Sequence, residues 1–219
     1  MRTLSIFVRP VWNARLHCAV LALVLTIGPA AALAGGGPLG IDHRLNANYG
    51  GIWKRGTQNA VLGLAVTAEI AAALWEGGDS RLGRTLWQSV DSTVLATATA
   101  DAGKLIFRRA RPTETSDPNK WFQSGNHYSF PSGEVAALTG LVTPFVLEYG
   151  QDHPAVYALA LLPAYGAAAR LKTRAHWQSD VLASIALGAA TGYYAHSRES
   201  PFILSTLPHG FMVGMRKNR

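Results

Sequence analysis

Apolar and small residues are concentrated in five long segments of the chain and predict helices there. The segments are residues 57–75, 81–109, 134–150, 153–172 and 178–196. Gly77 and Gly78 follow the first segment and Gly150 ends the third, which supports these limits. Pro144 lies inside the third segment and predicts a kink. The pattern therefore predicts an all-α, single-domain bundle of about five to six helices.

The same pattern divides the chain into residues 1–34, 35–56, 57–199 and 200–219. Residues 35–56 are rich in glycine and predict a loose lead-in to the helical domain, residues 57–199. Within that domain, residues 111–133 form a long polar loop, and loops of this length in compact domains are usually functional or disordered. In the tail, residues 200–219, two short apolar runs flank a Pro-His-Gly sequence and are compatible with a small β-hairpin.

The first 34 residues have the pattern of a secretory signal peptide. A basic stretch without acidic residues precedes an apolar run that ends in Ala32-Leu33-Ala34. This order is typical of an exported protein with cleavage after Ala34. The alternative is an uncleaved membrane anchor, although the apolar run is shorter than the roughly 20 residues of a spanning helix. Export predicts a periplasmic protein, or a membrane-associated one whose site faces the periplasm.

Removal of residues 1–34 changes the charge and the cysteine count. The formal net charge falls from +7 to +4, because three arginines are removed with no acidic residue. The single cysteine, Cys18, is also removed, which excludes disulfides and thiolate metal ligands from the remaining chain. A charge of +4 is too small to indicate a nucleic-acid partner. It suits an anionic substrate if the positive charges converge, and nothing here predicts a cofactor or an oligomeric state.

Ionisable residues inside the predicted helices bear on whether the helices cross a membrane. Glu69 lies within segment 57–75, and Asp91, Asp101 and Lys104 lie within segment 81–109. Each charged side chain at the centre of a bilayer costs about 2.5–3.5 kcal/mol on insertion scales. These residues favour a soluble bundle over a membrane-embedded one. Contact with a membrane surface stays open, because the abundant Gly and Ala residues permit close helix packing in either medium.

Cationic side chains and a helix start predict a site for an oxyanion such as phosphate. Lys104 lies near the end of a predicted helix, and Arg111 lies in the loop that follows it. Arg170 adds a guanidinium that can bind two oxygens at once. Ser132 and Gly133 precede a helix, whose free backbone N–H groups and dipole favour an anion.

One histidine in this set has a carboxylate partner at helical spacing. His176 and Asp180 are four residues apart, so on a helix they share one face. Asp180 would orient the imidazole, and His176 would attack phosphorus and carry the phosphoryl group. Each residue taken singly has a structural alternative: the basic residues Lys104, Arg108, Arg109 and Arg111 as a solvated face, Ser132 as a helix cap, and His176 as a structural histidine.

Three ordered motifs in these residues resemble the signature of a known superfamily. Lys-x6-Arg-Pro, then Pro-Ser-Gly, then Arg-x5-His-x3-Asp is similar to the signature of type 2 phosphatidic acid phosphatases, a superfamily that includes lipid phosphatases, class A bacterial acid phosphatases and vanadium haloperoxidases. The resemblance implies a metal-independent phosphatase, with His176 as the nucleophile and Asp180 orienting it. It further implies that Lys104, Arg111, Ser132, Gly133 and Arg170 bind phosphate.

The sequence departs from that signature at Glu134, where the superfamily normally has a histidine that acts as an acid on the leaving group. A carboxylate beside bound phosphate is best tolerated when protonated, because a neighbouring negative charge raises its pKa. A protonated Glu134 would protonate the leaving group, and the carboxylate would then activate water. His127, in the preceding loop, is a substitute acid. A milder departure is Ala169, where serine is usual.

Three functions are compatible with these residues. The first is an exported phosphatase acting through a phosphohistidine on phosphomonoesters or on lipid phosphates or diphosphates. The second is a vanadate-dependent peroxidase, because vanadate resembles the phosphoryl transition state. The third is a catalytically impaired protein that binds a phosphate or a lipid, an alternative motivated by the missing histidine. The sequence does not distinguish a soluble from a lipid substrate.

Overall fold

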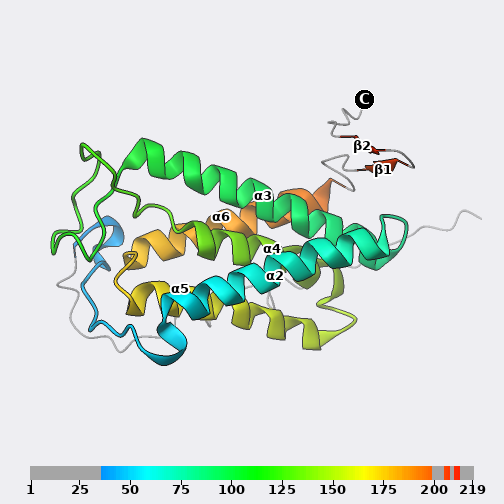
Figure 1. Cartoon of the computed structure of the whole chain (residues 1–219), viewed down its shortest axis with the longest axis horizontal. Coiled ribbons are helices and arrows are strands. Elements are labelled where there is room, and N and C mark those ends of the chain that lie inside the picture. The colour runs from blue at the N-terminus through cyan, green and yellow to red at the C-terminus, as the bar shows by residue number, and fades with distance from the viewer. Residues whose placement is uncertain (1–35, 199–204, 208–209, 213–219) are drawn as a thin grey trace, which may run out of the picture. The chain divides into compact units, whose positions relative to one another are not determined.

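The computed structural model describes residues 36–198, 205–207 and 210–212. Its long helices are α2 (Arg55–Glu76), α3 (Arg81–Phe107), α4 (Gly133–Tyr149), α5 (Leu161–Lys172) and α6 (Gln178–Ser197). Figure 1 shows these helices packed side by side as a bundle. The predicted all-α architecture and its number of helices are therefore confirmed. The predicted signal peptide and most of the tail lie outside the described residues.

Helix α4 is the central element because it contacts all four other long helices. Most of its first ten residues are buried, so it is apolar on every side rather than amphipathic. Small residues bring its neighbours close: an added Cβ at Gly188 of α6 would lie 2.5 Å from the carbonyl oxygen of Ala136. An added Cβ at Gly140 of α4 would lie 2.9 Å from Ser92 Oγ of α3. These contacts place the first turn of α4 inside the bundle.

The segment predicted as one helix over residues 153–172 consists of two parts. A 3-10 helix, η3 (Pro154–Ala160), precedes α5 (Leu161–Lys172). Pro163 explains the change, because proline has no N–H to donate to the carbonyl of Leu159 and is best tolerated in the first turn of an α-helix. The regular α-helix therefore starts only two residues before Pro163.

Residues 36–56 are not the loose lead-in that their glycines predict. They contain two short 3-10 helices, η1 (Pro38–Gly40) and η2 (Gly51–Trp53), and are bonded to the helical domain along their length. The backbone N–H of Asn48 donates to the Lys172 carbonyl at 2.9 Å, and Tyr165 Oη donates to the Ile52 carbonyl at 2.6 Å. These contacts hold the segment against the end of α5.

Two three-residue strands, β1 (Ser205–Leu207) and β2 (Gly210–Met212), pair antiparallel with Thr206 opposite Phe211. They lie where the sequence is compatible with a hairpin. The two residues that connect them lie outside the described residues.

Candidate active site

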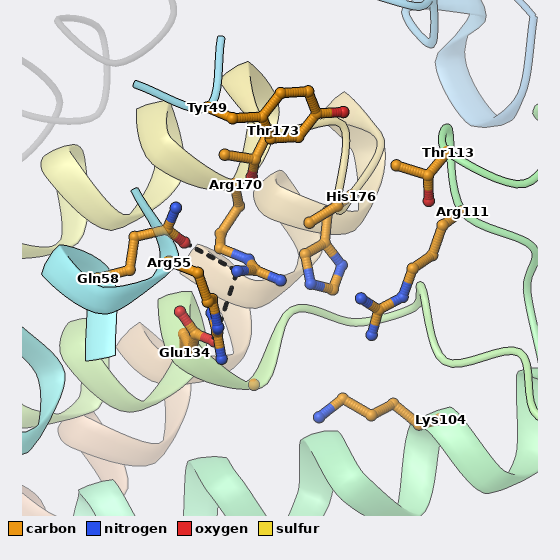
Figure 2. Close-up of a pocket in the computed structure, with 12 residues that line it drawn as sticks. Tyr49, Arg55, Gln58, Lys104, Arg111, Thr113, Glu134, Arg170, Thr173 and His176 are labelled. Carbon is orange, nitrogen blue, oxygen red and sulfur yellow. Dashed lines mark hydrogen bonds and ion pairs between the residues drawn. The ribbon is translucent and has the colours of Figure 1, made fainter. Parts of the chain in front are cut away.

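A cavity of about 450 Å3 lies where α3 and α5 end and α2 and α4 begin. Figure 2 shows the side chains that converge on it from these separate elements. The residues predicted from the sequence that line it are Lys104, Arg111, Gly133, Glu134, Arg170 and His176. Residues that the sequence did not indicate also line it: Tyr49, Arg55, Gln58, Thr113, Thr173 and Ala175. Ser132 and Asp180 are not among the lining residues.

Three cations come from three different elements. Lys104, in the last turn of α3, donates to Asp101 Oδ1 at 2.7 Å. Arg111 belongs to the loop after α3, and its guanidinium donates to the Tyr128 carbonyl at 3.3 Å. Arg170, in the last turn of α5, points into the cavity on the opposite side of His176 from Arg111 (Figure 2). The cavity is therefore positively charged on several sides.

The Arg170 side chain is almost completely buried. Its Nη1 donates to Gln58 Oε1 at 2.8 Å, while its Nε has no hydrogen-bond partner among the described residues. Burial lowers the pKa of Arg170 to about 10, and the nearby positive charges of Arg55 and Arg111 act in the same direction. A buried donor without a partner is unusual in native structures, and an anion in the cavity would satisfy it.

His176 lies two residues before the start of α6 and is buried. Its Nδ1 is 2.5 Å from the carbonyl oxygen of Ser129, an atom that only accepts, so Nδ1 carries the proton and Nε2 keeps its lone pair. Burial lowers the pKa of His176 well below its usual value, and the positive charges of Arg170 and Arg111 lower it further. A neutral imidazole with a free Nε2 is the form that can act as a nucleophile.

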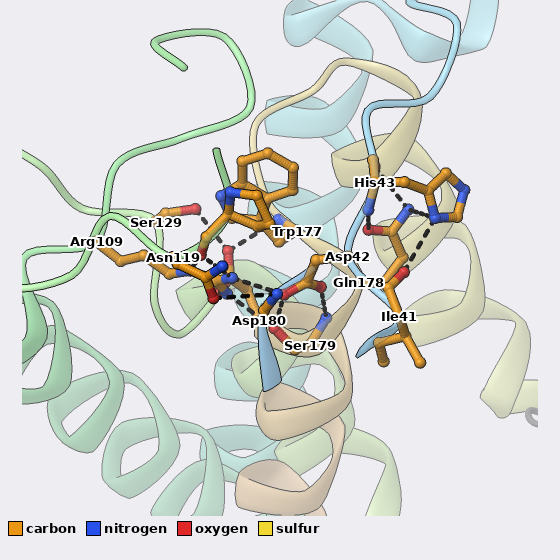
Figure 3. Close-up of polar contacts among 12 residues, drawn as sticks. Ile41, Asp42, His43, Arg109, Asn119, Ser129, Trp177, Gln178, Ser179 and Asp180 are labelled. Atoms are coloured by element: carbon orange, nitrogen blue, oxygen red, sulfur yellow. Dashed lines mark hydrogen bonds and ion pairs between the residues drawn. The ribbon is translucent and has the colours of Figure 1, made fainter. Parts of the chain in front are cut away.

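Asp180 does not hold His176 in the way that their spacing predicts. The distance between His176 Nδ1 and Asp180 Oδ2 is 3.9 Å, whereas the Ser129 carbonyl is at hydrogen-bond distance. Asp180 Oδ2 instead accepts from Ser129 Oγ at 2.5 Å and from the Trp177 backbone N–H at 2.8 Å (Figure 3). Asp180 therefore acts on the imidazole only indirectly. Its carboxylate holds the Ser129 side chain, and the Ser129 carbonyl accepts the hydrogen bond from His176.

The Pro-Ser-Gly segment supplies backbone rather than a hydroxyl to the cavity. An added Cβ at Gly133 would lie 2.8 Å from Lys104 Nζ, so only glycine lets the lysine come this close. The Ser132 backbone N–H donates to Ser184 Oγ at 2.7 Å. Ser132 Oγ is buried, has no hydrogen-bond partner among the described residues and does not cap α4. Ser132 therefore remains a predicted phosphate ligand that is adjacent to the cavity but outside its lining.

Glu134, the residue that departs from the signature, lines the cavity in an ion pair. Its Oε1 accepts a hydrogen bond from the Arg55 guanidinium and lies 3.6 Å from Nη1 of Arg170. Such pairs stabilise the ionised carboxylate, not the protonated acid expected from the sequence. The sequence argument considered only a bound phosphate beside Glu134 and did not anticipate the guanidinium of Arg55.

Comparison with known proteins identifies the family. The profile of the PAP2 superfamily matches residues 85–201, which is more than half of the chain. The chain belongs to the PAP2 superfamily. A lipid A 1-phosphatase of Porphyromonas gingivalis is 30% identical over 120 residues, which cover 54% of this chain and 24% of that relative. The chain therefore spans about a quarter of the length of this curated relative.

A solved structure is also similar to this PAP2 member. The crystal structure of Aquifex aeolicus LpxE aligns with a TM-score of 0.39 and 16% sequence identity, over 64% of this chain and 92% of that one. The superfamily match includes the segments that carry Lys104, Arg111, Glu134, Arg170 and His176. It begins after α2, so Arg55 lies outside it.

Arg109 of this PAP2 member is buried. The sequence allows a solvated basic face as one alternative for this residue. The structure contradicts that interpretation, because the side chain is fully buried. Its guanidinium donates to Asp42 Oδ2 at 2.6 Å, to Ser179 Oγ at 2.8 Å and to Asp180 (Figure 3). It also stacks 4.2 Å from the Trp121 ring centroid. Arg108 is exposed and has a left-handed backbone (φ 39°) that ends α3.

The Arg109 network joins three segments that are distant in sequence. Asp42 comes from the lead-in, and its Oδ1 also accepts from the Ser179 backbone N–H at 2.8 Å. Burial raises the pKa of Asp180 to about 6, while Arg109 and Ser129 act in the opposite direction. No local pattern around Asp42 could have revealed this contact. The network fixes the start of α6, and with it the position of His176.

His127, the substitute acid considered from the sequence, is not among the cavity-lining residues. Its Nδ1 lies 2.8 Å from Glu114 Oε2, which also accepts from the backbone N–H of Arg111 at 2.8 Å. His127 therefore helps to shape the loop that carries Arg111. Within the described residues, no group of three or more His, Cys, Asp or Glu side chains is arranged to hold a metal ion.

Proposed function

We propose that this PAP2 member is a phosphatase in which Nε2 of His176 attacks phosphorus and forms a phosphohistidine. The observation that supports it best is one neutral imidazole, with a free Nε2, in a cavity lined by Lys104, Arg111 and Arg170. The cations would neutralise the phosphoryl oxygens and stabilise the charge of the transition state. Superfamily membership supports the same reaction.

In the first step, the Nε2 lone pair forms a bond to phosphorus while the bond from phosphorus to the leaving oxygen breaks. The Nδ1 proton stays on His176, where the Ser129 carbonyl accepts its hydrogen bond. In the second step, water attacks phosphorus, the electron pair of the P–N bond returns to Nε2, and the proton that the water loses passes to solvent. The backbone N–H groups at the start of α4, beside Gly133, would bind the transferred phosphoryl group together with the cations.

The substrate that we propose is a phosphorylated lipid, presented at a membrane surface to an exported protein. Leu105 and Ile106 directly follow the cavity residue Lys104 in α3, and the Phe122 ring centroid lies 6.0 Å from that of Phe107. These three apolar side chains, Leu105, Ile106 and Phe122, have 66%, 61% and 61% of their surfaces exposed. Arg108 and Lys120, which are close to them in the sequence, are exposed basic residues. Basic and apolar residues together favour contact with an anionic bilayer surface. The name of the Porphyromonas relative, a lipid A 1-phosphatase, supports a lipid phosphate.

Purified protein tests the proposal directly. We expect hydrolysis of a soluble aryl phosphate and of a lipid phosphate in vesicles, and an acid-labile phosphoenzyme after brief reaction with radiolabelled substrate. His176→Ala should abolish both signals, whereas His153→Ala, an exposed histidine away from the cavity, should change neither. Phosphate binding without turnover would favour the binding protein instead, the alternative that Glu134 raises. Vanadate should inhibit hydrolysis; peroxidase activity on adding vanadate would favour the vanadate-dependent peroxidase instead.

A further inference from the structure

Arg55 and Glu134 form an ion pair at the cavity. Neither residue belongs to the three motifs, although Glu134 directly follows the Pro-Ser-Gly motif. Arg55 is the first residue of α2 and lies outside the segment matched by the superfamily profile. Its guanidinium donates to Glu134 Oε1, and Arg170 approaches the same oxygen at 3.6 Å. Figure 2 shows the pair beside Arg170 and apart from Lys104 and Arg111. This chain therefore combines an acidic residue directly after the second motif with a cation from another helix.

The pairing decides which proton transfers Glu134 can make. An ionised carboxylate only accepts hydrogen bonds and protons, so it has no proton for a leaving group. The same carboxylate is suited to take a proton from an attacking water. The other charged or titratable groups that line the cavity are Tyr49, Lys104, Arg111, Arg170 and His176. Of these, His176 carries its proton on Nδ1 toward Ser129, away from the reacting Nε2.

We propose that Arg55 is a positioning residue that holds Glu134 as a general base, and that the enzyme therefore prefers phosphoric anhydrides over alkyl monoesters. This inference rests on the proposed phosphatase function and names the substrate class of the same site. A phosphate group is a stable anion and departs from phosphorus without a proton, whereas an alkoxide requires one. A lipid diphosphate meets this requirement.

The two steps balance without an acid. His176 Nε2 attacks the terminal phosphorus, the anhydride P–O bond breaks, and its electron pair leaves with the departing phosphate. Water then forms a bond to the phosphoryl phosphorus, the P–N bond breaks, and its electron pair returns to Nε2. Glu134 accepts the proton released from water and passes it to solvent. Arg55 contacts neither reacting atom in this sequence and acts through Glu134.

The dependence of rate on the leaving group tests this inference. We expect kcat/KM of the wild type to fall about 100-fold from nitrophenyl phosphate to phenyl phosphate, because general acid catalysis is commonly worth about 10²–10⁴ in rate. We expect a prenyl diphosphate to be hydrolysed at least about 100-fold faster than the prenyl monophosphate. Glu134→His, which restores an acid, should reduce both ratios.

Substitution of Arg55 isolates its role. Arg55→Gln removes the guanidinium that holds the Glu134 carboxylate, so both ratios should fall, while Arg55→Lys should preserve them. Arg84→Gln, an exposed arginine of α3 away from the cavity, is the matched control and should change neither rate nor ratio. Equal rates on good and poor leaving groups in the wild type would overturn this inference and leave the phosphatase intact. Absence of hydrolysis of every phosphate would overturn the phosphatase proposal as well.

Discussion

The protonation of His176 is set by its neighbours rather than by its own chemistry. Burial removes the water that would stabilise an imidazolium, and Arg170, Arg111 and Lys104 repel it, so the pKa lies well below 6.5. The neutral, nucleophilic form exists above that lowered pKa. It therefore persists as the pH falls through 6.5 and is lost only at lower pH.

We expect NMR titration of His176, assigned by comparison with His176→Ala, to show a ring that stays neutral as the pH falls from 7 through 6.5. Arg170→Gln removes one positive charge, so it should move the midpoint of the titration to higher pH. A wild-type midpoint at or above 6.5 would contradict the assigned electrostatics. NMR is the suitable measurement because a phosphate substrate has its own second pKa near 6 and distorts a pH–rate profile.

Asp180 illustrates how spacing can indicate the right residues and the wrong contact. The spacing of four residues predicts one shared helix face, but His176 precedes α6 and only Asp180 lies in its first turn. The chain folds so that the Ser129 carbonyl lies between them and accepts the Nδ1 proton. The Asp180 carboxylate instead accepts hydrogen bonds from Ser129 Oγ, the Trp177 backbone N–H and the Arg109 guanidinium. Its role as an orienting residue stays a prediction, with Ser129 as the intermediary.

At the level of the elements, close contact between α4 and α6 sets the geometry of the site. Helix α4 begins with Gly133 and Glu134, and α6 begins just after His176. Gly188 lets the two helices touch, since an added Cβ would lie 2.6 Å from Thr139 Cβ and 2.8 Å from the Gly140 backbone nitrogen. Backbone atoms cannot rotate away as a flexible side chain can, so the helices themselves would have to separate.

We expect Gly188→Ala to destabilise the fold by about 1–3 kcal/mol, the usual cost of overpacking. The higher helix propensity of alanine, worth at most about 1 kcal/mol, is smaller than this cost. Gly63→Ala in α2 is the matched control, because nothing lies within 4 Å of its added Cβ, and it should be neutral or slightly stabilising. Thermal and denaturant unfolding of both variants measure the difference. Equal stability of the two would show that α4 and α6 adjust without cost.

At the scale of the whole molecule, polar residues inside and apolar residues outside bear on the membrane question. Glu69 and Asp91, which favoured a soluble bundle in the sequence, are buried between helices rather than exposed on the outside. Trp75 of α2 is 92% exposed. Among the described residues one helix, α2, is long and apolar enough to cross a membrane, and only 17% of its most apolar stretch is buried. The sequence argument against a membrane-embedded bundle therefore loses its basis.

We expect the exposed apolar side chains of Leu105, Ile106 and Phe122 to matter only for a substrate held in a bilayer. Burial of a large apolar side chain is worth about 1.5–3 kcal/mol, so Leu105→Ser combined with Ile106→Ser should lower hydrolysis of a vesicle-bound lipid phosphate about tenfold or more. Hydrolysis of a soluble aryl phosphate should be unchanged. Ser124→Ala, an exposed residue of the same loop, is the control. An equal loss on both substrates would indicate damage to the site instead of lost membrane contact.

The sequence by itself determined where the five long helices lie and most of the charged residues that line the cavity at their ends. Apolar periodicity and helix-ending residues are local properties, and Lys104, Arg170 and His176 lie near helix ends that a bundle brings together. Only the tertiary structure decided that Arg109 is buried with Asp42 and Asp180, that the Ser129 carbonyl holds His176, and that Arg55 pairs with Glu134. Each of these contacts joins residues at least 47 positions apart. Burial and pairing at such separations depend on how whole elements pack, which no local pattern records.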